Sequence, residues 1–292
     1  MLIQRVKNQA RLQCLRALQG IESILARPRF RDGPTPYESQ IINDLETEGV
    51  HVTTLEQLAP SVAQQTLSKA SSLIAKQSGP DSAELWHDSG ASSDLTAEAL
   101  VRHIPEIYTV GLDPRILRLV ERYLKLPAAY HGAVVRHSLV NGIGVGPRLW
   151  HRDAEDFHVL RMVIYLNDVT LGGGPFEYIP RTAGDLIVGR VFGAGGLITN
   201  DQMREILPEE QWKRITGPAG TVVLCDTARV FHHESLQTHQ DRFVVMIGYS
   251  SRRPAGWDLA VAHFPVERVK TELELIVPAQ NRAAVFDWRK CS

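Results

Sequence analysis

The chain has 292 residues, of which 43% are hydrophobic and 22% charged, and its formal net charge is −1. These values are typical of a globular protein, and a nearly neutral chain gives no electrostatic reason to expect nucleic acid as a partner. The three cysteines are far apart and form no CxxC pair. This spacing excludes a disulfide framework or a cysteine zinc site and favours a reducing, cytoplasmic compartment. No apolar run is long enough to span a membrane, so we expect no transmembrane segment.

Residues 1–25 have the pattern of an amphipathic helix. Apolar residues recur at helical spacing, and the other face carries basic residues that include Arg5, Lys7, Arg11 and Arg16. We expect the apolar face to pack on the domain and the basic face to lie in solvent. Peripheral contact of residues 1–25 with an anionic membrane is the alternative.

Residues 1–129 are expected to form a mainly helical N-terminal part. Residues 61–77 have the helical period, and residues 77–94, "QSGPDSAELWHDSGASSD", indicate an exposed loop. Asp113 and Pro114 suit the N-cap and the first position of a helix that continues to about residue 126.

From about residue 130 the chain becomes a series of short β-rich runs bounded by Gly, Pro, Asn and Asp. The runs cover residues 128–141, 158–169, 174–180, 184–192, 219–226 and 242–251. Such a series predicts an antiparallel sandwich or barrel as a core over residues 130–252. We expect a helical insertion at about 199–216 and a C-terminal extension at 253–292. The whole chain, 1–292, is then a single domain that is mainly β with flanking helices.

The stretch "RLWHRDAEDFHVLRMVIYLNDV" places polar groups beside a buried strand. His151 and Asp153 are two residues apart, so in extended backbone they point to the same side and can meet one ion. A third ligand is available after the strand that ends at Asp226, where His232 and His233 follow. Two histidines and one carboxylate form the facial set typical of non-haem Fe(II), which leaves coordination positions open.

Arg242 begins the β-rich run "RFVVMIGYS". A guanidinium at the start of such a strand can point into the mouth of a barrel. Arginine binds a carboxylate through two parallel hydrogen bonds. A carboxylate clamp beside a metal site implies a co-substrate that is itself a carboxylate.

The stretches "LWHRDAEDF", "IYLNDVTLGGGPFEYIPRT" and "GTVVLCDTARVFHHESLQTHQDR" together resemble the phytanoyl-CoA dioxygenase (PhyH-like) family of Fe(II)- and 2-oxoglutarate-dependent oxygenases. The resemblance covers residues 110–252 and implies a double-stranded β-helix, or jelly roll, as the core. It also implies that Fe(II), 2-oxoglutarate and O2 are used to hydroxylate an unactivated C–H bond. Related halogenases carry Ala or Gly where this chain has Asp153, so the resemblance implies hydroxylation.

The resemblance assigns roles to individual residues. His151, Asp153 and His232 match the metal ligands, and Arg242 matches the residue that holds the distal carboxylate of 2-oxoglutarate. His233 is the rival of His232 for the distal ligand. Further candidates for contact with 2-oxoglutarate are Ser235, Tyr165 and Asn141. The candidates for contact with the substrate are Arg136 and Arg161. Asp156 and His158 are expected to shape the loop after the metal ligands.

The substrate class stays open at this point. The family acts on acyl, small-molecule and sugar or lipid-linked substrates, and "LWHRDAEDF" also resembles bacterial hydroxylases of the Kdo sugar of lipopolysaccharide. The alternative function is a cupin-like metal-binding jelly roll that isomerises or binds a small molecule. We expect a small or lipid-linked partner, no nucleic acid, and a cytoplasmic location that is peripheral to a membrane if the first helix binds one.

Overall fold

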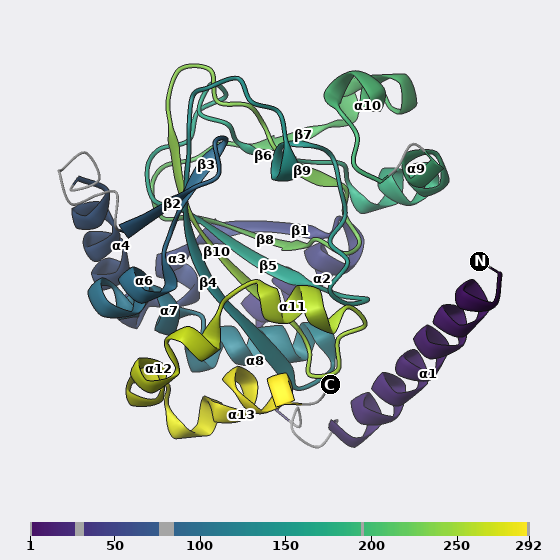
Figure 1. Ribbon diagram of the computed structural model, residues 1–292, viewed down its shortest axis with the longest axis horizontal. Coiled ribbons are helices and arrows are strands. Elements are labelled where there is room, and N and C mark those ends of the chain that lie inside the picture. The colour runs from purple at the N-terminus through teal and green to yellow at the C-terminus, as the bar shows by residue number, and fades with distance from the viewer. Residues whose placement is uncertain (1, 27–31, 76–84, 194–195, 291–292) are drawn as a thin grey trace.

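The computed structural model describes residues 2–26, 32–75, 85–193 and 196–290, and its centre is two antiparallel sheets (Figure 1). The major sheet has seven strands in the order β1-β8-β5-β10-β4-β3-β2, and the minor sheet has the order β7-β6-β9. The major-sheet strands are β1 (Val50–Thr54), β2 (Trp86–Asp88), β3 (Ser92–Leu95), β4 (Ala128–Ser138), β5 (Leu160–Tyr165), β8 (Thr221–Asp226) and β10 (Arg242–Ser251). The minor-sheet strands are β6 (Phe176–Tyr178), β7 (Lys213–Ile215) and β9 (His232–Glu234). This arrangement is a jelly roll with flanking helices, which confirms the predicted fold class.

Side chains that alternate along the major strands enter two different cores. On β5, Met162 and Ile164 join the large core under the helices, whereas Val163 and Tyr165 join a smaller core between the two sheets. The period of two in a strand produces this division. Charged side chains that point between the sheets therefore lie in a space enclosed by protein.

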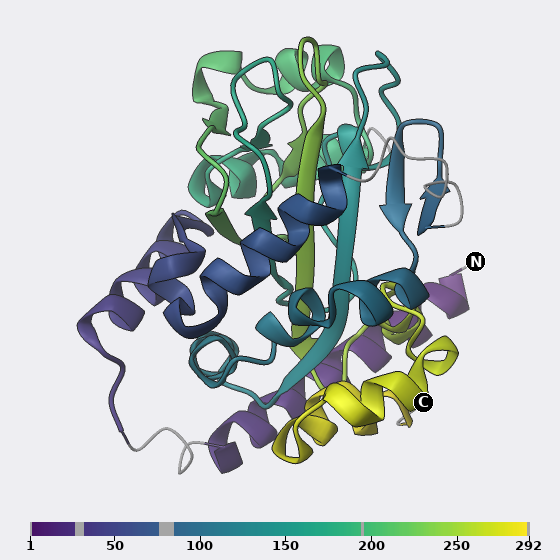
Figure 2. The same cartoon turned by 90° about the vertical axis from the view of Figure 1, so that its left-hand side faces the viewer.

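Helices cover the outer face of the major sheet (Figures 1 and 2). The N-terminal helices of this layer are α2 (Pro36–Thr47), α3 (Leu55–Leu58), α4 (Pro60–Ala75), α6 (Ala97–His103), α7 (Pro105–Val110) and α8 (Pro114–Leu124). The C-terminal extension adds α12 (Lys270–Ile276) and α13 (Arg282–Val285) to this layer, whereas α11 (Trp257–Ala262) packs through Ala260 against Ala129 of β4 and Trp288. The helix expected after Asp113 is confirmed, since the Asp113 side chain accepts from the backbone N–H of Arg115 and Pro114 is the first helical residue.

One sequence-based expectation fails at the start of the insertion. Residues 184–192 were expected to be a strand but belong to α9 (Arg181–Gly193). Gly184, Ile187 and Val191 are buried at helical spacing while Leu186 is exposed, so the apolar run has a period near 3.6 rather than 2. The insertion consequently begins with α9, continues with α10 (Asn200–Ile206), and ends in β7, which pairs with β6.

The predicted loop at 77–94 also differs from the structure. Its first part, 77–84, lies outside the described residues, but β2 and β3 form a hairpin within the rest. The hairpin extends the major sheet through pairing of β3 with β4. One of its residues, Asp94, thereby comes to lie beside the strand that carries Arg136.

Helix α1 (Leu2–Ala26) lies along the outside of the domain (Figure 2). Arg11 donates to the carbonyl of Ala255, and the guanidinium of Arg16 lies 4.5 Å from the ring centroid of Phe157. The apolar residues Leu18, Ile21, Ile24 and Leu25 are 44–73% exposed. The expected orientation is therefore wrong for the described side chains, since two basic residues reach the domain and the apolar stripe faces outward. Among the described residues, no helix has the length and hydropathy of a membrane span.

Candidate active site

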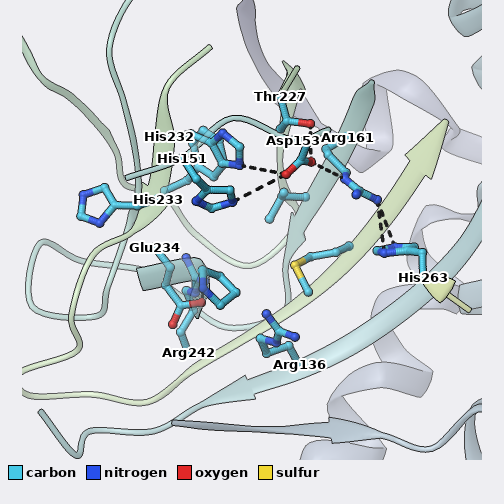
Figure 3. Close-up of a pocket in the computed structure, with 14 residues that line it drawn as sticks. Arg136, His151, Asp153, Arg161, Thr227, His232, His233, Glu234, Arg242 and His263 are labelled. Atoms are coloured by element: carbon cyan, nitrogen blue, oxygen red, sulfur yellow. Dashed lines mark hydrogen bonds and ion pairs between the residues drawn. The ribbon is translucent and has the colours of Figure 1, made fainter. Parts of the chain in front are cut away.

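Three potential ligand atoms from two chain segments converge between the sheets (Figure 3). His151 and His232 form an isolated antiparallel bridge, in which each backbone N–H donates to the other's carbonyl, at 3.1 and 3.0 Å. The Nε2 atoms of His151 and His232 lie 3.6 and 4.0 Å from Oδ1 of Asp153. All three ligand atoms lie within 4.8 Å of one another, so they can hold one metal ion.

Backbone carbonyls hold the orientation of both imidazoles. Nδ1 of His151 lies 2.8 Å from the carbonyl of Leu149, and Nδ1 of His232 lies 3.1 Å from the carbonyl of Val230. Because a carbonyl only accepts, each Nδ1 carries a proton, so in the neutral ring Nε2 keeps its lone pair. Burial, together with the neighbouring His151, lowers the pKa of His232 to about 3. At neutral pH both geometry and charge state therefore suit metal ligation.

The two oxygens of Asp153 have different partners. Oδ1 faces the histidines, whereas Oδ2 accepts from the Thr227 hydroxyl at 2.6 Å and from Nε of Arg161 at 3.0 Å. Burial acts to raise the pKa of Asp153, but the Arg161 guanidinium and the two histidines hold that pKa well below its usual range. Arg161 also pairs with Glu155 and lies 3.2 Å from Nε2 of His263. Asp153 is thus ionised and presents a single oxygen to the metal position.

Arg242 lies at the other end of the same cavity. Its Nη1 donates to the carbonyl of Gly174 at 2.7 Å, and its Nη2 lies 2.5 Å from Oε2 of Glu234. Glu234 belongs to β9 and follows His232 by two residues, so both side chains point to the cavity. Arg242 belongs to β10, so this ion pair joins the minor sheet to the major one.

The cavity has a volume of about 250 Å³. Its walls combine ligand atoms, cations and apolar side chains. The lining residues are Arg136, Pro147, His151, Asp153, Arg161, Val163, Phe176, Thr227, His232, His233, Glu234, Arg242, Met246 and His263. A small anionic molecule can therefore meet the metal position and a guanidinium within one space.

The structure brings some of the predicted co-substrate and substrate residues to the cavity and excludes others. Arg136 and Arg161 line it. Tyr165 does not, because its hydroxyl is buried between the carbonyl of Ile215 and the backbone N–H of Phe176. Two further candidates, Asn141 and Ser235, are also absent from the lining. The Asn141 amide donates to the Gly90 carbonyl, and the Ser235 hydroxyl donates to Glu177, so the structure gives no support for their contact with a co-substrate.

His233 points away from the metal position. Its Nε2 lies 2.8 Å from Oε2 of Glu177, and its Nδ1 lies 3.2 Å from the carbonyl of Arg148. Glu177 lies opposite it on β6, and Arg214 pairs with the same carboxylate at 2.6 Å. With both nitrogens engaged, His233 fastens β9 to β6, which favours His232 as the candidate ligand.

Asp156 and His158 lie in the loop beyond the metal position, as expected. Asp156 accepts from the hydroxyl and backbone N–H of Ser251 and from Gln19 of α1. His158 bonds to the fully buried Asp226 at 2.7 Å. These contacts connect the loop to the end of β10, to β8 and to α1.

Sequence reasoning missed three polar residues of the site. Thr227 directly follows the strand-ending Asp226, and Glu234 follows His232 at strand spacing, so both had a local signal. His263 comes from the C-terminal extension, after α11, and had none. The packing of Ala260 of α11 against Ala129 of β4 accompanies the contact of His263 with Arg161, and no local spacing specifies it.

Comparison with known proteins supports the fold. No family model and no curated protein matches the chain. Among solved structures, HygX from Streptomyces hygroscopicus with nickel and 2-oxoglutarate bound has a TM-score of 0.51 and 15% identity, covering 75% of this chain and 88% of its own. The epimerase SnoN in complex with Fe3+, alpha ketoglutarate and nogalamycin RO has a TM-score of 0.53 and 16% identity, covering 77% and 89%. EctD from S. alaskensis with bound Fe has a TM-score of 0.51 and 16% identity, covering 76% and 79%.

Proposed function

We propose that this chain is an Fe(II)- and 2-oxoglutarate-dependent dioxygenase that hydroxylates an unactivated C–H bond of a small, non-protein substrate. The main support is the convergence of two imidazole nitrogens and one carboxylate oxygen in a cavity that Arg242 also lines. Three protein ligands leave positions for a co-substrate and oxygen, unlike a closed structural zinc site. When bound, iron with 2-oxoglutarate supplies an oxidant from O2 as the co-substrate is decarboxylated to succinate. The similar structures with 2-oxoglutarate bound are consistent with this choice.

In this proposal His151, Asp153 and His232 hold the iron. The carbonyls on the Nδ1 atoms of the histidines hold the rings, and Thr227 and Arg161 restrict Asp153 to one free oxygen. Such outer partners set the geometry of metal ligands. Asp153 fills the position that a halide would need, which favours hydroxylation over halogenation.

Arg242 is the residue we propose for the distal carboxylate of 2-oxoglutarate. It lies in the cavity with the metal position, and its guanidinium can bind two oxygens. Val163, Phe176 and Met246 form the apolar part of the wall. Apolar side chains beside charged groups lower the local dielectric constant, which strengthens the charge interactions in the cavity.

For the substrate we propose a small acyl, sugar or lipid-linked molecule that carries an anionic group, and Arg136 is the cavity residue offered to that group. A Kdo-type sugar acid belongs to this class. Arg161 is less suited, because two carboxylates, Asp153 and Glu155, engage it, whereas one carboxylate, that of Asp94, engages Arg136.

The test of the oxygenase is spectroscopic. Anaerobic Fe(II) with 2-oxoglutarate should give a weak visible charge-transfer band, and O2 should then yield succinate. Arg242→Gln should need far more 2-oxoglutarate to develop the band while its iron affinity stays the same. A chain that binds iron but gives neither band nor succinate would instead be a cupin-like isomerase or binding protein.

We also propose that the protein works in the cytoplasm and that α1 contacts an apolar or membrane surface. The support is its outward stripe of Leu18, Ile21, Ile24 and Leu25. Cosedimentation with anionic liposomes, with and without residues 1–32, tests this. Equal pelleting of both forms would reject it.

A further inference from the structure

We propose that Glu234 is an internal competitor for the co-substrate. Its carboxylate occupies part of the Arg242 guanidinium, and the distal carboxylate of 2-oxoglutarate must displace it. Glu234 would then set the affinity of the clamp for dicarboxylates. This inference rests on the proposed function, because it takes Arg242 as the clamp.

The Arg242–Glu234 pair is buried at one end of the cavity, away from His151, Asp153 and His232 (Figure 3). Arg242 is 3% exposed and Glu234 is 7% exposed. Burial acts to raise the pKa of Glu234, but Arg242 holds that pKa below its usual range, so the carboxylate is charged. An incoming dicarboxylate therefore meets a guanidinium whose charge is already partly balanced.

The contact of Glu234 with Arg242 is incomplete, as a comparison with Arg136 makes clear. Arg136 donates from Nε and Nη2 to the two oxygens of Asp94, at 2.7 and 2.8 Å. Both donor atoms on this edge of its guanidinium therefore have a partner. Arg242 gives only Nη2 to Glu234, and its Nε is buried with no hydrogen-bond partner among the described residues. A carboxylate with both oxygens on Nε and Nη2 would satisfy Arg242 better than Glu234 does.

Glu234 can leave Arg242 and keep its contacts with Gln237 and Arg148. Its Oε1 accepts from Gln237 at 2.6 Å and lies 3.4 Å from Nε of Arg148, whereas only Oε2 meets Arg242. Arg148 is itself fixed by the carbonyls of Leu139 and Ile143. Glu234 thus sits between two buried guanidinium groups. Two cations and one anion leave a charge of +1, which a second carboxylate balances.

The exchange has a measurable consequence. The apparent affinity of a ligand falls by the fraction of protein in the competent state. If Arg242 is free of Glu234 about a tenth of the time, removal of the competing charge should strengthen 2-oxoglutarate binding about tenfold. The matched substitution Asp94→Asn frees Arg136 instead and should change that binding less than about twofold.

The experiment is calorimetric titration of the full chain, loaded with Mn(II) in place of iron, with 2-oxoglutarate. Wild type, Glu234→Gln, Asp94→Asn and Arg242→Gln are compared, and each is repeated with glutarate, which lacks the keto group that reaches the metal. We expect about tenfold tighter binding of both ligands by Glu234→Gln and loss of binding by Arg242→Gln. Glu234→Asp, which keeps the charge but withdraws it by one methylene, should bind both ligands more tightly than wild type and carries the test if Glu234→Gln fails to fold.

The other outcomes would overturn either this inference or the proposed function. Unchanged or weaker binding by folded Glu234 variants overturns the inference. Tighter binding by Asp94→Asn alone would make Arg136 the clamp and also overturn it. If the wild type with metal binds no 2-oxoglutarate and no Glu234 variant restores binding, the proposed function fails rather than the competition alone.

Discussion

The two faces of the major sheet carry different chemistry on the same strands. On β5, Met162 and Ile164 enter the helix-covered core, while Arg161 and Val163 line the cavity between the sheets. The covered face is apolar, whereas the cavity face holds cations paired with carboxylates. Buried ion pairs contribute little net stability compared with apolar packing. Apolar packing on the covered face therefore stabilises the fold, whereas the cavity face presents charged groups that a ligand can meet.

The largest effect expected from this division is loss of metal binding in His232→Ala. Partners outside the ligand shell already change metal affinity about 10–100-fold, so loss of a ligand should weaken it by at least about 100-fold. The neighbouring variant His233→Gln, on the other face of β9, should retain affinity within about tenfold. Titration with Mn(II) measures both. Equal losses would mean that β9 acts only as a structural unit.

Arg161→Met should be the most destabilising change on the cavity face. It leaves Asp153 and Glu155 without their shared cation, and an uncompensated buried charge costs about 3–5 kcal/mol. Urea unfolding of the metal-free protein measures this cost. Saturating Mn(II) should recover part of it, because the ion takes over the charge of Asp153. A loss that metal does not reduce would argue that Arg161 is merely packed.

Ile164→Ala tests the covered face. Ile164 is fully buried, and its truncation should lower the free energy of unfolding by about 2–5 kcal/mol. Metal affinity of the folded variant should stay within about twofold of wild type. The adjacent Val163→Ala, which lines the cavity, should do less to stability. Reduced metal affinity in folded Ile164→Ala would break the separation of the two faces.

Thr227→Val should have the smallest effect. It removes one hydrogen bond to Asp153 and should lower stability by about 0.5–1.5 kcal/mol and metal affinity by about tenfold. Thr221→Val, at the start of β8 and outside the cavity lining, is the control. If the two variants bind Mn(II) equally, Thr227 does not orient the carboxylate.

Local sequence signals were reliable where one element decides the structure. The cap at Asp113 and the strands containing Val163 and Val244 follow from residue type and period. The strand prediction for the apolar run at 184–192 was wrong, because a short run fits either a helical or a strand period and only the neighbouring elements decide which face is buried. The prediction that the apolar face of α1 packs on the domain was wrong for the same reason. The helix docks through contacts with Ala255 and Phe157, which are distant in sequence.

By itself, the sequence determined that His151 and Asp153 lie on one side of the chain and that a histidine and Arg242 follow a later strand, because strand geometry fixes the direction of alternate side chains. Only the tertiary structure decided that His232 rather than His233 meets them, because the pairing of β9 with β6 directs His233 to Glu177. It alone also placed Glu234 against Arg242. That contact crosses from one sheet to the other, and no local spacing specifies how two sheets face each other.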